Sequence, residues 1–212
     1  MANGFVDQRF CEPCGLIPLG PLVSPNPRCA CPPFPGTGGG AAGGGAIIPY
    51  SSGTVPATLS FVLGGLLSTA SIVGFGTSVP AVMLAGGLID TTGLANISFT
   101  VPRAGTITGI AANFQTIAAL ALLGSTATVS ATLYRAIPGS NLFAPIPGAT
   151  VVLQPSLTGV VPIGTLLSGI TALSAPVAAG DRLMMVFSAT IAGGAPLAVA
   201  IVGNASAGVN IV

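Results

Sequence analysis

Hydrophobic and polar residues alternate with a period of two in the C-terminal half of the chain. Between positions 126 and 134 the even-numbered residues carry hydroxyl groups and the odd-numbered ones are Ala, Val or Leu. Residues 206–211 alternate in the same way, with Ala207, Val209 and Ile211 on one side. This alternation predicts strands with one buried face, whereas the continuous apolar run at 183–187 predicts a strand that is buried on both faces.

Turn signals separate these runs, for example Pro138-Gly139, Gly180-Asp181 and Gly193-Gly194. About ten short strands result, at a spacing of roughly 8–15 residues, which is typical of a sandwich or a barrel. Helical periodicity is weak, and the alanine-rich stretch at 118–123 is expected to be a loop or a strand. The sequence therefore predicts an all-β fold.

The chain divides into three parts by composition. Residues 1–35 are rich in Pro and Cys and form an arm that is extended rather than helical, because proline removes backbone donors and fixes φ. Residues 36–46 form a flexible Gly-rich linker, whose ten-residue core spans at most ~33 Å. Residues 47–212 form one domain that is long enough for a single core.

Charged residues make up only 4% of the chain, against a usual share of roughly 25%, and the net charge is +1. This charge excludes an electrostatic partnership with nucleic acid or an acidic membrane surface. Two classes of protein fit the composition: a membrane protein, and an all-β subunit whose faces are covered by partners. Hydropathy flags residues 59–77 as a spanning helix, but Pro56, Pro80, many glycines and the lack of basic flanks argue against it.

The residue types leave little room for catalysis. The chain has no His and no Lys, which removes the commonest general base, the commonest metal ligand and Schiff-base chemistry. The domain holds two carboxylates, Asp90 and Asp181, which in principle form a glycosidase pair. We expect instead that both are structural, and that Arg103, Arg135 and Arg182 form ion pairs. No enzymatic activity and no cofactor are predicted.

Four cysteines lie in the arm, in two close pairs: Cys11 with Cys14, and Cys29 with Cys31. Disulfides within or between chains are the favoured interpretation, because an extended arm has no core to hold it in place. A zinc site and free thiols remain as alternatives.

Five segments of the domain resemble one family in order. They are residues 73–78 (Val-Gly-Phe-Gly-Thr-Ser), 99–108, 145–150, 182–190 and 203–209. Together they are similar to the C-terminal domain of the Bacillus collagen-like exosporium glycoproteins, especially the BclB-like group. The resemblance covers about residues 47–212.

The resemblance implies a jelly roll like those of complement C1q and tumour necrosis factor, and a tight homotrimer on the spore surface. The family's collagen-like stalk is missing here, and the arm with its glycine tether stands in its place. The chain is therefore expected to be a structural subunit of a spore appendage fibre in which trimers stack head to tail, held by an exosporium or coat anchor protein. A trimeric adhesin head is the alternative.

The arm carries the features that such a connector needs. Candidate docking residues are Phe5, Val6, Phe10, Leu16 and Ile17, which give an extended segment apolar side chains, and prolines lower the entropy cost of ordering it. The first ten residues lack a basic segment followed by an apolar core, so we expect synthesis in the mother-cell cytoplasm without a signal peptide.

Overall fold

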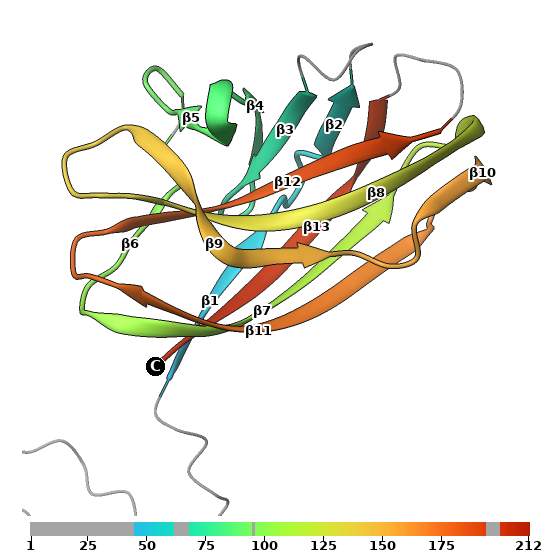
Figure 1. Ribbon diagram of the computed structural model, residues 1–212. Coiled ribbons are helices and arrows are strands. Elements are labelled where there is room, and N and C mark those ends of the chain that lie inside the picture. The colour runs from blue at the N-terminus through green and yellow to red at the C-terminus, as the bar shows by residue number, and fades with distance from the viewer. Residues whose placement is uncertain (1–44, 62–67, 95, 194–199) are drawn as a thin grey trace, which may run out of the picture. The chain divides into compact units, whose positions relative to one another are not determined.

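A computed structural model describes residues 45–61, 68–94, 96–193 and 200–212, and these residues form an all-β domain (Figure 1). By its internal contacts the chain divides between Ala42 and Gly43. The predicted boundaries at residues 35 and 46 stay predictions. Among the described residues, no helix is both long and apolar enough to cross a membrane. In the window at 59–77, residues 59–61 belong to β2 and residues 68–73 belong to β3. The alternative of a spanning helix in this window is therefore wrong.

The strands are β1 (Ala46–Ser51), β2 (Ala57–Phe61), β3 (Ser68–Val73), β4 (Ser78–Val82), β5 (Ile89–Asp90), β6 (Phe99–Thr100), β7 (Gly105–Thr116), β8 (Leu120–Ala136), β9 (Leu142–Val152), β10 (Leu157–Val161), β11 (Leu166–Val177), β12 (Arg182–Ala192) and β13 (Ala200–Ile211). A short 3-10 helix, η2 (Ala85–Gly87), lies between β4 and β5. The alanine-rich stretch at 118–123 enters β8, as expected. The strands are not uniformly short, because β8 alone has 17 residues.

The strand order is that of a jelly roll. One layer has the order β1-β13-β7-β11 and the other has the order β3-β12-β8-β9, and every one of these pairs is antiparallel. Strands β7 and β8 lie in opposite layers, and so do β11 and β12, and β12 and β13, whereas β8 and β9 are neighbours in one layer. These crossings between layers are those of two nested Greek keys. Strand β2 pairs with both β13 and β3, and so carries the chain from the first layer to the second (Figure 1).

The main core lies between the two layers and follows the predicted alternation. On β8, Ala127, Val129, Ala131 and Leu133 are fully buried, while the hydroxyl-bearing residues between them point out of the sandwich. Alternate residues of β13 are buried in the same core. Full burial of a side chain such as Val or Leu contributes about 1.5–3 kcal/mol, so these alternating residues hold the two layers together.

Strand β12 is buried on both faces, which confirms the prediction from its continuous apolar run. Leu183, Met185 and Phe187 belong to the main core. Met184 and Val186 point the other way, into a second core that covers the outer side of the sheet. The second core also contains Ile89, Ile97, Tyr134 and Phe143, and it was not expected from the sequence.

Candidate assembly surface

Among the residues that the structure describes, the outward side of the layer β1-β13-β7-β11 carries no ionisable side chain, and we call this side the neutral face. Its outward residues are Ile47, Pro49, Ala111, Asn113, Gln115, Leu166, Ser168, Ile170, Ala172, Asn204, Ser206, Gly208 and Asn210. The strand register aligns these residues in rows that cross all four strands. One row consists of Ile170, Ala111, Gly208 and Pro49, and is apolar from edge to edge.

Large apolar side chains project from the neutral face between small ones. The side chain of Ile170 is 84% exposed, that of Ile47 is 74% exposed and that of Leu166 is 54% exposed. The positions between them hold Gly, Ala, Ser and Asn, which leave the backbone close to the surface. Exposed apolar side chains on a surface without charged groups are a common feature of protein–protein contact surfaces.

The opposite outer surface has a different chemistry. On β8 the outward residues Thr126, Thr128, Ser130 and Thr132 form a line of hydroxyl groups. Some of them bond across the sheet: the hydroxyls of Ser130 and Ser188 are 3.2 Å apart, and those of Thr132 and Thr150 are 3.0 Å apart. We call this the hydroxyl face. Each hydroxyl both donates and accepts hydrogen bonds, so this face interacts well with water without any charge.

The two ends of the domain also differ. Ala46 pairs with Ile211, and the backbone of Val212 bonds to that of Thr106. The start of β1 and the end of β13 therefore lie at the same end of the domain. At the other end, which we call the distal end, β10 pairs with the start of β8 (Figure 1). Three large apolar side chains are exposed there: Leu123 at 71%, Val160 at 80% and Ile163 at 67%.

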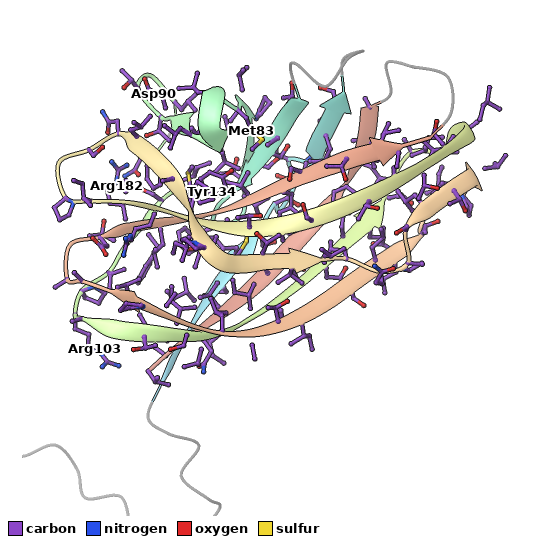
Figure 2. All side chains as sticks on the ribbon, in the orientation of Figure 1. Met83, Asp90, Arg103, Tyr134 and Arg182 are labelled. Atoms are coloured by element: carbon purple, nitrogen blue, oxygen red, sulfur yellow. The ribbon has the colours of Figure 1, made fainter. Side chains whose placement is uncertain are left out.

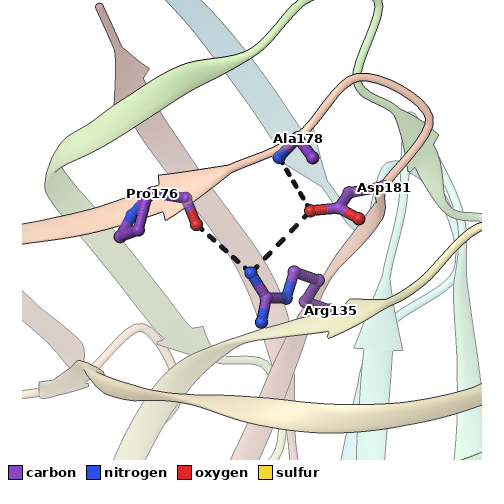
Figure 3. Close-up of polar contacts among 4 residues, drawn as sticks. All are labelled: Arg135, Pro176, Ala178 and Asp181. Atoms are coloured by element: carbon purple, nitrogen blue, oxygen red, sulfur yellow. Dashed lines mark hydrogen bonds and ion pairs between the residues drawn. The ribbon is translucent and has the colours of Figure 1, made fainter.

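Arg135 and Asp181 form the expected ion pair (Figure 3). Arg135 Nη1 lies 3.8 Å from Asp181 Oδ2 and donates a hydrogen bond to the Pro176 carbonyl at 3.2 Å. The same carboxylate oxygen accepts a hydrogen bond from the Ala178 amide at 2.9 Å. These contacts close the turn between β11 and β12, which is a structural role.

The other two arginines of the domain differ from the expectation of ion pairs. Arg182 donates hydrogen bonds to Ser98 Oγ, to the Ser140 carbonyl and to Asn141 Oδ1, and all three acceptors are neutral. Its guanidinium carbon lies 5.2 Å from the centre of the Phe143 ring. Within the described part of the chain, neither Arg182 nor Arg103 forms an ion pair with a carboxylate.

Asp90 and Asp181 do not have the environments of a glycosidase pair. Asp90 is exposed, and hydrogen bonds from Thr92 lower the pKa of its carboxyl group. A general acid for glycoside hydrolysis needs the opposite shift. Asp181 is buried against Arg135. Among the described residues there is also no group of three His, Cys, Asp or Glu that could hold a metal ion.

The predicted site residues of the arm lie outside the described residues. These are the four cysteines Cys11, Cys14, Cys29 and Cys31 and the docking candidates Phe5, Val6, Phe10, Leu16 and Ile17. Their roles stay predictions. The neutral face was not found from the sequence, although the alternation of residues 166–172 carries a signal for it: outward Leu, Ser, Ile and Ala alternate there with inward residues.

No family model matches the chain. A curated relative, "Collagen-like protein 1" of Acanthamoeba polyphaga mimivirus, is 36% identical over 156 residues, which are 69% of this chain. The chain spans only 16% of that relative's length. A solved structure, that of Eiger TNF from S. frugiperda, matches with a TM-score of 0.35 and 13% identity, over 78% of this chain and 94% of that one. The chain is thus similar in sequence to part of a collagen-like protein.

Proposed function

We propose that this chain is a structural subunit that forms homotrimers through its jelly-roll domain, and that the trimers join head to tail into a fibre on the spore surface. An exosporium or coat protein anchors the fibre. The observation that carries the proposal is the neutral face, with Ile170 and Ile47 exposed on a surface that has no charge.

The neutral face supports self-association in two ways. One apolar row crosses all four strands, and the rows beside it carry no ionisable group, so no buried charge opposes the burial of this face against another copy. The hydroxyl face remains for contact with water. A second copy is the partner that fits best, since an uncharged surface offers no electrostatic complementarity to a charged partner.

Three copies are supported by the similarity to collagen-like proteins. A collagen triple helix winds three chains, so a domain attached to one is held in groups of three, and a similar domain without the stalk is expected to associate in the same number. The resemblance of residues 47–212 to the exosporium glycoproteins supports the same number and the spore surface as the location. A closed three-fold ring stops growing, and a fibre needs a second contact that does not close, which we assign to the arm.

The trimer is tested by Ile170→Asp in the full chain. Burying a carboxylate in an apolar contact without a partner weakens self-association by at least about 100-fold, or roughly 2.8 kcal/mol. We expect the natural chain to have three times the chain mass at micromolar concentration by light scattering or native mass spectrometry, and the variant to be monomeric.

Thr150→Asp is the matched control, because Thr150 is also exposed in a strand but lies on the hydroxyl face. It adds the same charge and should leave the trimer intact. A monomeric natural chain would contradict the trimer. Equal mass distributions for the two variants would contradict the assignment of the interface to the neutral face.

A further inference from the structure

A hollow of about 270 Å³ lies on the outer side of β12, and residues 91–94 and 96–98 form part of its lining. Arg182, Asn96, Ser98 and Asn141 contribute polar groups to its lining, and Ile97 and Met184 contribute apolar ones. Arg182 lies on the same side of the sheet as Asp90, whereas Arg103 lies well away from both (Figure 2). None of the residues that line the hollow belongs to the neutral face or to the exposed residues of the distal end, so the hollow is distinct from both.

Arg182 has no counterion in this hollow among the described residues. Its guanidinium has five N–H donors, and the hydrogen bonds from Nε and Nη1 use three of them, at 3.1–3.2 Å. Nη2 makes no hydrogen bond to a described residue. The Phe143 ring beneath the guanidinium and the three acceptors around it hold the group in one orientation.

We propose that this hollow binds the carboxylate of a small hydroxylated ligand such as a sugar acid, with Arg182 as the charged anchor. The site goes beyond the structural role proposed above, and failure of either proposal leaves the other intact. A guanidinium binds carboxylates with short, charge-assisted hydrogen bonds, and its remaining Nη2 donors match that demand.

The rest of the lining suits the remainder of such a ligand. Amide and hydroxyl side chains can exchange hydrogen bonds with sugar hydroxyls, and the apolar Ile97 and Met184 can contact the face of a ring. The volume is just below the roughly 300–1,000 Å³ of pockets for drug-sized molecules, so a single ring is the fitting size.

The carboxylate has two conceivable sources, a free ligand and the chain's own arm. The chain has four acids, and Asp181 is engaged by Arg135 while Asp90 accepts a bond from the Thr92 amide. The other two, Asp7 and Glu12, belong to the arm. Both sources present the same chemistry to Arg182, and the experiment below separates them.

The test is titration of the full chain with glucuronate, and with glucose as the neutral counterpart, by NMR or calorimetry. We expect glucuronate to bind with a dissociation constant on the order of 1 mM, as for a ligand of one ring, and glucose to bind at least about tenfold more weakly. Arg182→Gln should lose this preference. Arg103→Gln removes the same charge outside the hollow, and should keep it.

A second variant guards against misfolding of Arg182→Gln. Asn141→Asp is nearly isosteric and places a carboxylate of the protein against the guanidinium, so it should block glucuronate while preserving the fold. Asp90→Asn should leave glucuronate affinity unchanged or raise it. A fall in affinity for this variant would show that the hollow prefers cations and would overturn the proposal.

The source of the carboxylate is read from the double variant Asp7→Asn/Glu12→Gln. Unchanged glucuronate affinity assigns the hollow to a free ligand, whereas increased affinity shows that the arm competes for Arg182; both results support a carboxylate site. The proposal is overturned if glucuronate and glucose bind the natural chain equally, if neither binds and the double variant does not restore binding, or if Arg103→Gln and Arg182→Gln have the same effect.

Discussion

Tyr50 on β1 buries a hydroxyl group without a partner. Its side chain is 2% exposed, and the hydroxyl makes no hydrogen bond to a described residue. The ring stacks on Phe75, with their centres 5.4 Å apart. The ring therefore contributes apolar packing, whereas the hydroxyl has lost its bonds to water without replacing them.

Tyr50→Phe should raise the free energy of unfolding by about 1–2 kcal/mol, because it removes an unsatisfied polar group and keeps the ring. The measurement is chemical denaturation of both proteins at one protein concentration. Tyr134→Phe is the control: Tyr134 is also buried, but its hydroxyl is not among the buried atoms that lack a partner, so no such gain is expected.

The same variant has a signature at high pH. Burial raises the pKa of Tyr50, and to a lesser extent that of Tyr134, since an ionised phenolate is poorly solvated inside the protein. The folded state then holds the phenol proton more tightly than the unfolded state. The associated stability is complete below about pH 10 and is lost as the pH rises further, and Tyr50→Phe should reduce that loss. Stability that falls equally in both proteins would argue against this account.

At the scale of the strand, β13 depends on a glycine where it lies close to β7, its neighbour in the same layer. A Cβ at Gly203 would overlap the Gln115 carbonyl oxygen and the ring of Phe114 on the neighbouring β7. The backbone of β7 cannot yield without loss of its pairing with β13. Gly203 is thus required by packing rather than by an unusual φ angle.

Gly203→Ala should lower the free energy of unfolding by about 2–3 kcal/mol, which is the upper part of the usual range for an overpacked core. Thermal or chemical unfolding provides the measurement. Gly109→Ala is the matched control within the same sheet, because its new Cβ would meet only the Thr171 carbonyl oxygen at an ordinary 3.7 Å. Equal losses for the two variants would refute the steric explanation.

The elements that alternate or are continuously apolar could be predicted from sequence, and the others could not. The sequence pattern predicts which faces are buried for residues 126–134 and 183–187. Burial on one face gives alternation along a strand, and burial on both faces gives a continuous apolar run. The second core escapes such analysis. Its members Ile89 and Ile97 come from a two-residue strand and a loop, which are too short to show a period.

The candidate sites were harder to predict than the fold. The neutral face consists mostly of Gly, Ala, Ser and Asn, which a sequence reader assigns to turns and linkers. Only the pairing of β1, β13, β7 and β11 assembles them into rows. The hollow at Arg182 likewise joins segments near residues 96, 141 and 182 that no local motif connects.

At the scale of the whole molecule, the arrangement of the ends supports a directional fibre. The arm precedes β1, whose start lies beside Ile211, while exposed Leu123, Val160 and Ile163 occupy the distal end. An arm that reaches the distal end of the next trimer gives a contact that repeats without closing. In the proposed trimer, three arms raise the local concentration, so that modest single contacts become strong together.

Deletion of residues 1–35 should therefore leave folded trimers that form no fibres, as seen by electron microscopy and light scattering. Replacement of all four cysteines by Ser is a milder change, and any fibres it forms should dissociate more readily on heating if disulfides lock the arms. Normal fibres from the deleted chain would show that lateral contacts between domains drive assembly instead.

The pairing of β1 with β13 also determines how the domain bears a load. The six residues of β1 are in register with β13 from Ala46↔Ile211 to Ser51↔Ser206, and the chain enters at the Ala46 end. Inter-strand hydrogen bonds are perpendicular to the strands. Tension applied to Ala46 along the strand axis therefore shears all the bonds of this ladder at once, instead of opening them singly. Such a geometry resists mechanical extraction of β1, which is the property that a subunit of the proposed fibre would need under tension.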